Sequence, residues 1–137
     1  MPPCLFCEIV ARDRPAAVVL DEPGVLGFLD ARPLFPGHVL VVPTEHVDTL
    51  EDLQDSDPLF AAVRRIAAAV RRAIGAEGTF VAMNNTVSQS VPHLHVHVVP
   101  RTKGDGLRGL FWPRTKYRDE QMESAAERIR AELSSTP

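Results

Sequence analysis

The chain has 137 residues, 45% of them hydrophobic, which is the size and apolar content of one globular domain with a single core. Its formal net charge of -3 excludes a broadly basic surface, so we expect no general electrostatic binding to nucleic acid or to an anionic membrane. Apolar runs stay well short of the roughly 20 residues that a membrane-spanning helix needs, and the first residues lack the pattern of a signal peptide. We expect one domain over residues 1–137 and a cytoplasmic location.

Three short apolar runs in the first third of the chain predict β-strands. Residues 18–20 and 25–29 flank a turn at 21–24 that contains Pro and Gly, which is typical of a hairpin. Residues 38–42 are rich in β-branched side chains and predict a third, well-buried strand. Pro43 follows directly and must lie at the end of this strand, because it cannot donate a backbone hydrogen bond.

The clearest helix begins near Asp57, whose side chain can cap it, has Pro58 in its first turn and ends before Gly75. Apolar residues recur along it at spacings of three and four and form one stripe, as expected of a helix that packs on a sheet. The residues of this stripe are Phe60, Val63, Ala67, Val70 and Ile74.

The second half of the chain predicts two more strands and a second helix. Residues 79–83 form one strand, a polar loop follows at 84–90, and the last strand runs from Pro92 through Val99. Apolar residues at helical spacing predict a helix from about Asp119. These residues are Met122, Ala126, Ile129 and Leu133.

Three histidines alternate with apolar residues in the expected last strand, at His93, His95 and His97. Since side chains alternate along a strand, the three imidazoles would project from one face. With a rise of about 3.3 Å per residue, the α-carbons of His93 and His97 lie roughly 13 Å apart, so at most two of the rings can bind one metal ion. The alternative is a half-exposed strand with ordinary polar residues. However, all five histidines of the chain lie near predicted strands and none in a predicted helix, which favours a functional site.

Imidazole suits phosphoryl and nucleotidyl transfer because it is largely neutral near pH 7, nucleophilic and able to carry protons. It attacks through Nε2 when its Nδ1–H is held elsewhere, commonly by a backbone carbonyl, and neighbouring imidazoles can support the phosphate. Gln89 and Ser90, just before the histidines, add amide and hydroxyl donors for phosphate oxygens, although a plain loop role explains them equally well. The sequence therefore predicts a small nucleotide hydrolase or nucleotidyl transferase.

The two cysteines of the chain, Cys4 and Cys7, form a single C-x-x-C pair. In a reducing compartment such a pair indicates metal binding or redox chemistry before a structural disulfide. A tetrahedral structural zinc site would need two more ligands, which His46 and one histidine of the expected last strand can supply. A redox pair or two buried cysteines would explain the pattern too.

The run from Gln89 to Val99 resembles the signature of the histidine triad family of nucleotide hydrolases and transferases, in which three histidines alternate with apolar residues and two more apolar residues follow. The resemblance extends, in the family's order, to residues 4–9, 28–30, 36–43 and 111–113. It implies an α+β fold with a five-stranded antiparallel sheet, a long helix and a C-terminal helix. It also implies that the sheet continues across a two-fold homodimer.

By the same resemblance, His95 is the nucleophile that takes up a nucleoside monophosphate as a covalent intermediate, which water then hydrolyses. His97 and His38 match positions that support the phosphate and the nucleophile. Branches of the family that carry the C-x-x-C pair bind a structural zinc, as in the phosphoramidases similar to Hint. The matching zinc ligands are Cys4, Cys7, His46 and His93.

The resemblance also implies a set of substrate-binding residues. Asp30 matches the acidic residue that binds ribose, Phe28 lies where the nucleoside pocket is walled, and Gln89 and Ser90 match donors on the phosphate side. The loop at 84–88 lacks the glycines that many members have before Gln-Ser, but Asn84 or Asn85 can still reach the phosphate. We expect this loop to alter the pocket around the leaving group.

Three functions remain open on the sequence. The first is hydrolysis of a purine nucleoside 5'-monophosphate joined to an amine, through a nucleotidyl-histidine intermediate. The second is cleavage or phosphorolysis of dinucleoside polyphosphates by the same nucleophile. The third is a non-catalytic, nucleotide-binding regulatory dimer. Trp112 falls in a tail that approaches the partner's site in some relatives, and it reads equally well as a packed aromatic residue.

Overall fold

The computed structural model describes residues 3–108 and 114–135. The chain divides into two compact units, Met1–Asp105 and Gly106–Pro137. In chain order, the elements of the first unit are helix α1 (Leu5–Val10), strands β1 (Val18–Glu22), β2 (Val25–Leu29) and β3 (Val39–Pro43), a 3-10 helix (Leu50–Asp52), helix α2 (Asp57–Ile74), and strands β4 (Gly78–Ala82) and β5 (Val96–Arg101). The described part of the second unit contains helix α3 (Gln121–Ser135).

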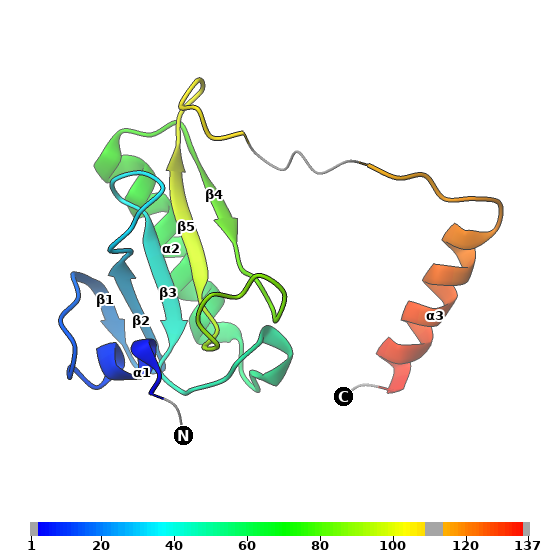
Figure 1. Cartoon of the computed structure of the whole chain (residues 1–137), viewed down its shortest axis with the longest axis horizontal. Coiled ribbons are helices and arrows are strands. Elements are labelled where there is room, and N and C mark those ends of the chain that lie inside the picture. The colour runs from blue at the N-terminus through cyan, green and yellow to red at the C-terminus, as the bar shows by residue number, and fades with distance from the viewer. Residues whose placement is uncertain (1–2, 109–113, 136–137) are drawn as a thin grey trace. The chain divides into compact units, whose positions relative to one another are not determined.

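The five strands form one antiparallel sheet in the order β1-β2-β3-β5-β4, which Figure 1 shows with α2 lying along one face. This architecture confirms the predicted α+β fold. One row of paired residues crosses four of the strands: Val18 pairs with Phe28, Phe28 with Leu40, and Leu40 with His97. Residues that pair directly in an antiparallel sheet present their side chains on the same face, so this row forms a continuous surface.

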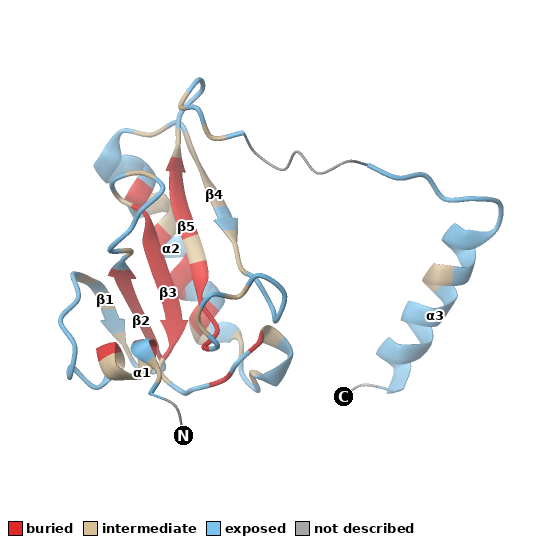
Figure 2. Ribbon diagram, viewed as in Figure 1, coloured by how far each residue is buried: buried red, intermediate tan, exposed pale blue. Residues whose placement is uncertain are grey.

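Both faces of the sheet are covered near its centre, where Figure 2 shows the buried residues of β2, β3 and β5. Val39 and Val41 pack in a cluster with α2, whereas Leu40 and Val42 pack in a second cluster with α1. A strand that is buried on both faces reads as a continuous apolar run, which explains the sequence of β3. The residues that alternate along β3 therefore separate an α2 face from an α1 face.

Helix α2 begins one residue after Ser56 and ends at Gly75, which takes the left-handed conformation at φ 74°. Asp57 is the first helical residue and not the cap, and its N–H bonds to the carboxylate of Asp55 at 3.1 Å. The expected apolar stripe is partly wrong, because Phe60 and Ile74 are 42% and 49% exposed. The buried residues of the helix are Leu59, Ala62, Val63, Ile66 and Val70. The face of α2 that packs on the sheet is therefore formed by these buried residues, which also recur at spacings of three and four and include an alanine.

Strand β5 begins at Val96, four residues later than Pro92, so the expectation of three histidines on one strand face is wrong. Pairing with β3 starts at Val96, which lies opposite Val41 in the middle of β3. Before it the backbone is irregular, and the N–H of Leu94 bonds instead to the carbonyl of Val47 at 2.8 Å. The chain thereby turns the three imidazoles toward different partners.

Helix α1 and the 3-10 helix were not expected from the sequence. In α1, the Sγ atom of Cys4 accepts the N–H of Cys7 at 3.4 Å and so caps a helix of six residues. In the second unit, α3 confirms the expected C-terminal helix, and its Met122, Ile129 and Leu133 are exposed. The aromatic segment 111–113, including Trp112, lies outside the described residues. Within the described part of the chain, no helix is long and apolar enough to cross a membrane.

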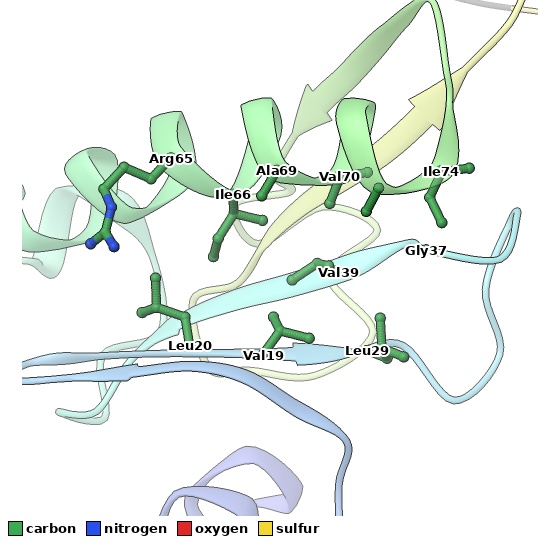
Figure 3. A pocket seen from close by; sticks show the side chains of 11 residues that line it. Val19, Leu20, Leu29, Gly37, Val39, Arg65, Ile66, Ala69, Val70 and Ile74 are labelled. Carbon is green, nitrogen blue, oxygen red and sulfur yellow. The ribbon is translucent and has the colours of Figure 1, made fainter.

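An apolar cavity of about 400 Å³ lies on the α2 face, between α2 and strands β1 to β3. Figure 3 shows Val19, Leu29 and Val39 of the sheet facing Val70 and other residues of α2. Arg65 is the one charged side chain among its lining residues. Chemistry-bearing side chains gather instead on the α1 face.

Candidate functional site

A pocket of about 700 Å³ opens on the α1 face of the sheet. Its size is that of an ordinary small-molecule site. The three neighbours Phe28, Leu40 and His97, which belong to the row described above, line it side by side. The other lining residues are Leu5, Phe6, Ile9, Arg14, Pro15, Ala16, Ala17, Leu29, Asp30, Ala31, Ser90, Val91 and His95. The pocket is therefore mainly apolar, with a few polar groups in it.

His95 is held in one orientation and one tautomer. Its side chain is buried, and Nδ1 lies 2.8 Å from the backbone carbonyl oxygen of His93. A carbonyl has no proton to give, so Nδ1 carries the proton and donates it, and Nε2 of the neutral ring keeps a free lone pair. The edge of the Phe6 ring packs against the imidazole, with centroids 5.0 Å apart. These contacts fix His95 as an oriented nucleophile.

A hydrogen-bonded chain fixes the tautomer of His97. The N–H of Leu34 donates to Nδ1 of His38 at 3.0 Å, so the proton of this neutral imidazole is on Nε2. His38 then donates through Nε2 to Nδ1 of His97, also at 3.0 Å. Nε2 of His97 consequently carries a proton. Since His97 lines the pocket and lies 5.1 Å from His95, centroid to centroid, it can supply a hydrogen-bond donor beside the nucleophile.

Burial keeps both histidines of this chain neutral. It lowers the pKa of His97 to about 4, with the neighbouring His95 and His38 adding to the effect and Asp30 opposing it. The pKa of His38 is lowered as well, mainly by burial and against the carboxylate of Asp30. Neutral imidazoles are required for the N–H···N bond between the two rings, so the tautomer assignment and the direction of the pKa shifts agree.

Asp30 lies beside this chain at the end of β2. One carboxylate oxygen accepts the N–H of Arg32 at 2.9 Å, and the other is 3.7 Å from Nε2 of His38. Asp30, His38 and His97 are close enough together to hold a metal ion by distance alone. However, a metal on Nε2 of His38 would put the proton of that ring on Nδ1, where it would oppose the N–H of Leu34. The hydrogen-bonded chain is the better account of this group.

The structure brings some of the expected substrate-binding residues to the pocket and leaves others outside its lining. Phe28, Asp30 and Ser90 line it. Gln89 does not, because its amide donates to the carbonyl of Asp48 at 2.5 Å and accepts the N–H of Thr86 at 3.1 Å. Asn84 likewise bonds within its own loop, to the carbonyl of Ser88 at 3.2 Å. His38 is not among the lining residues either, and it acts through its hydrogen bond to His97.

Phe6 and Arg14 are among the pocket residues that the sequence did not single out. Phe6 lies between the two cysteines of the C-x-x-C pair, where no local pattern marks it as a pocket residue. Arg14 follows α1 in a charged stretch that reads as an ordinary solvated loop. No local periodicity indicates that either residue lines the pocket, because the pocket joins this N-terminal segment to residues 90–97, which lie about 80 residues further along the sequence.

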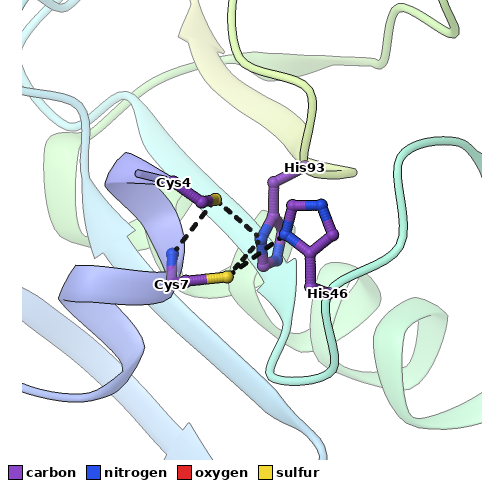
Figure 4. A group of neighbouring side chains, drawn as sticks. All are labelled: Cys4, Cys7, His46 and His93. Atoms are coloured by element: carbon purple, nitrogen blue, oxygen red, sulfur yellow. Dashed lines mark hydrogen bonds between the residues drawn. The ribbon is translucent and has the colours of Figure 1, made fainter. Parts of the chain in front are cut away.

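The four expected zinc ligands come together at one end of α1, as Figure 4 shows. Nε2 of the buried His93 donates to the carbonyl of Pro43 at 2.9 Å, so its Nδ1 is unprotonated and can bind a metal. This Nδ1 lies 3.4 Å from Sγ of Cys4 and 3.5 Å from Sγ of Cys7. His46 presents Nδ1 at 3.2 Å from Sγ of Cys7.

The geometry of this cluster fits zinc. With Zn–S near 2.3 Å and Zn–N near 2.0–2.1 Å, a tetrahedral site separates sulfur from nitrogen by about 3.6 Å, close to the separations observed here. Nε2 of His46 faces the carboxylate of Asp48 at 3.0 Å, an outer contact that orients a metal-binding histidine. Burial, and then the proximity of Cys4, raises the pKa of Cys7 to about 11. Two thiolates are therefore stable at this site only when a cation is bound to them.

Comparisons with known proteins agree with this fold and this set of residues. Residues 11–104 match the HIT domain. The chain is 33% identical over 132 residues to the adenosine 5'-monophosphoramidase of Schizosaccharomyces pombe, a match that covers 95% of this chain and 98% of that protein. It is 38% identical over 82 residues to the asymmetrical bis(5'-nucleosyl)-tetraphosphatase of the same organism, which covers 57% of this chain and 45% of that protein.

Solved structures give the same result. A HIT family member from Bacillus subtilis superposes with a TM-score of 0.86 at 36% identity, over 93% of this chain and 95% of that one. A zinc-bound histidine triad protein from Mycobacterium smegmatis gives a TM-score of 0.71 at 37% identity, over 96% of each chain. The fold and the site define a small α+β protein with a histidine-lined pocket. The chain belongs to the HIT family, whose members include nucleotide hydrolases.

Proposed function

We propose that this protein hydrolyses nucleoside 5'-monophosphate derivatives in which an amine is joined to the phosphate, through a covalent nucleotidyl-His95 intermediate. The observation that carries the proposal is the hydrogen bond from Nδ1 of His95 to the carbonyl of His93, at 2.8 Å. It leaves Nε2 as a lone-pair donor in a pocket of nucleotide size. The similarity to an adenosine 5'-monophosphoramidase over nearly the whole chain supports this class of substrate.

In the first step, Nε2 of His95 attacks phosphorus and the P–N bond breaks. The electron pair of that bond passes to the departing amine, which takes up one proton from solvent. The N–H of His97, fixed on Nε2 by the chain from Leu34 and His38, donates a hydrogen bond to a phosphate oxygen as charge develops there. Ser90, which also lines the pocket, provides a second donor.

In the second step, water attacks phosphorus and the P–N bond to His95 breaks. The nucleoside monophosphate leaves, water releases one proton to solvent, and the imidazole returns to its neutral tautomer. The proton taken up by the amine in the first step thus balances the one released in the second. The bond from Nδ1 to His93 is present throughout, so the ring is not reoriented between steps.

The rest of the pocket fits the nucleoside. Phe28, Phe6 and Leu5 supply apolar surface for a base, and Asp30 supplies carboxylate oxygens for ribose hydroxyls. We propose that Cys4, Cys7, His46 and His93 hold a structural zinc, which would fix α1 against the segment that carries His95. Asn84 and Gln89 stay outside the proposed binding set, because the amide of Asn84 bonds within its loop and the amide of Gln89 donates to the carbonyl of Asp48.

We also propose a two-fold homodimer formed along β4. The sheet ends at β4, whose side chains are only half-buried in one copy of the chain. An edge strand with free N–H and C=O groups pairs readily with its own copy, which would continue the sheet across the two-fold axis.

A second substrate class is favoured by one observation, the similarity to a bis(5'-nucleosyl)-tetraphosphatase over part of the chain. In a dinucleoside polyphosphate the leaving group is a nucleotide and not an amine, and the same nucleophile serves. Turnover of a diadenosine polyphosphate and of an adenosine phosphoramidate by one preparation separates the two classes. A strong preference for the polyphosphate would overturn the first proposal.

The decisive test follows amine release from a fluorogenic adenosine 5'-phosphoramidate. The wild type, His95→Ala and the control Val87→Ala are compared, since Val87 is 79% exposed and outside the pocket. We expect release by the wild type and the control, a loss of at least about a thousandfold in His95→Ala, and a trapped adenylyl group detected by mass only where His95 is present. Full activity in a folded His95→Ala would overturn the mechanism. Nucleotide binding without turnover on either substrate class would indicate a regulatory binding protein.

A further inference from the structure

Two side chains with full charges line the histidine pocket, Asp30 and Arg14. The proposed hydrolysis uses Asp30 and leaves Arg14 without a role. Exposed arginines near a helix end are usually solvated, but this one contributes to the wall of a pocket that is otherwise largely apolar. The position of Arg14 along the pocket indicates which part of a bound nucleotide it contacts.

Arg14 lies at the opposite end of the pocket from the nucleophile. His97 on β5 pairs with Leu40 on β3, which pairs with Phe28 on β2, which pairs with Val18 on β1. At about 4.8 Å between strands, β1 is roughly 14 Å from β5. The segment 14–17 leads into β1 and continues its pairing, because the N–H of Leu29 bonds to the carbonyl of Ala17 at 2.9 Å.

This order of groups follows the order of the parts of a nucleotide. The phosphate belongs at His95 and Ser90, and the ribose belongs at Asp30, which directly follows β2. The base then occupies the remaining end, between the apolar side chains of α1 and the segment that carries Arg14. An arginine at this end meets the edge of the base and not the phosphate.

The guanidinium is already oriented and still has donors to offer. Nε of Arg14 bonds to the carboxylate of Glu8 at 3.1 Å, and the backbone N–H of Arg14 bonds to the carbonyl of Glu8 at 3.3 Å. The ion pair uses Nε and leaves the two terminal nitrogens, which carry four N–H groups, for a ligand. Arginine only donates, so it selects a ligand edge that consists of acceptors.

We propose that Arg14 reads the base and makes this pocket prefer guanine over adenine, an inference that rests on the proposed binding of a nucleotide in this pocket. Guanine presents two adjacent acceptors, O6 and N7, to which a guanidinium can donate in parallel. Adenine presents N7 beside an amino group, which is itself a donor and faces the guanidinium unfavourably. The Arg14 side chain is 53% exposed, so the preference is about fivefold, at the low end for such a contact.

The test measures binding of GMP, IMP and AMP by calorimetry, which needs no turnover. The variants are Arg14→Met, which keeps the length of the side chain without its donors, and Arg12→Met as the matched control. Arg12 is paired with Asp21 at 2.6 Å and does not line the pocket. IMP carries O6 and N7 but lacks the amino group of guanine, so it isolates the edge that Arg14 would read.

We expect the wild type and Arg12→Met to bind GMP and IMP about fivefold more tightly than AMP, and Arg14→Met to bind all three within about twofold. Three results would overturn the inference: no preference in the wild type, a preference that survives in Arg14→Met, or an equal loss of affinity for all three nucleotides in that variant. Turnover of the phosphoramidate is measured on the same samples. Absent turnover with an Arg14-dependent preference would count against the proposed hydrolysis and leave the base recognition standing.

Discussion

The carbonyl oxygen of His93 accepts the Nδ1–H of His95 at 2.8 Å, while the ring of the same His93 faces the sulfur atoms of Cys4 and Cys7. One residue therefore belongs to both the proposed zinc cluster and the support of the proposed nucleophile. Any change that releases the His93 ring also moves the carbonyl that sets the tautomer of His95.

Metal removal is therefore expected to affect stability and catalysis together. Incubation with a strong chelator should lower the midpoint of thermal unfolding by about 10 °C or more, because structural zinc contributes directly to folding. Turnover should fall in parallel. Thermal melts, metal analysis and phosphoramidate turnover on the same samples check this, with Cys7→Ser as a variant that should be insensitive to the chelator. If the metal is shown to be gone and both quantities are unchanged, the proposed coupling is wrong.

The stability of the fold should depend on pH through His97 and His38. The lowered pKa of His97 means that the unfolded chain binds more protons than the folded one between about pH 6.5 and about pH 4, and the lowered pKa of His38 acts in the same direction below about pH 6.5. Unfolding takes up protons in this window, so the free energy of unfolding should decrease as the pH falls through it. Above about pH 6.5 the contribution of these two groups is constant.

The variant that checks this is His97→Asn, which removes the larger titration and keeps a polar side chain. Denaturant unfolding at a series of pH values should give a shallower slope for His97→Asn than for the wild type between about pH 4 and 6.5. Equal slopes for the two proteins would show that His97 is not protonated on unfolding in this range.

Asp30→Asn tests the proposed contact with ribose. The amide keeps the shape and can still accept the N–H of Arg32, but it loses the negative charge that two hydroxyl donors would share. We expect the wild type to bind AMP at least about tenfold more tightly than 2',3'-dideoxy-AMP, and the variant to lose most of this difference. An undiminished difference in Asp30→Asn would assign the hydroxyl contacts to another group.

Gly37 should be sensitive to substitution for a reason separate from the site. Its φ is +97°, and a Cβ added there would lie 2.6 Å from Cγ1 of Ile74. Gly104 has a similar φ of +81° and no atom within 4 Å of an added Cβ. We expect Gly104→Ala to cost about 1 kcal/mol from backbone strain alone, and Gly37→Ala about 2–4 kcal/mol. Denaturant unfolding of both variants, and of Gly37→Ala combined with Ile74→Ala, separates backbone strain from steric overlap. Equal losses of unfolding free energy in Gly37→Ala and Gly104→Ala would exclude the overlap with Ile74.

The sequence by itself determined the strand at 25–29, a third strand predicted at 38–42 and found at 39–43, the long helix and the residue types of the site. Short apolar runs rich in β-branched residues, a Pro at a helix start and a Gly at its end act within a few residues, so they can be read locally. The start of β5 was misplaced because alternation continues through His93 and His95, whereas pairing with β3 begins only at Val96. The predicted apolar stripe of α2 differs from the buried face because the helix carries two series of small or apolar residues at helical spacing, and the sequence alone does not show which of them packs on the sheet.

Only the tertiary structure decided how these residues work together. The acceptor for His93 is the carbonyl of Pro43, 50 residues away, and the partner of His97 is His38, 59 residues away. The tautomer of each imidazole, the exclusion of Gln89 from the pocket lining and the position of Arg14 follow from such pairings. A local pattern specifies which side chains are present and which face they take, but the proton on a ring is set by its neighbour in space, and packing chooses that neighbour.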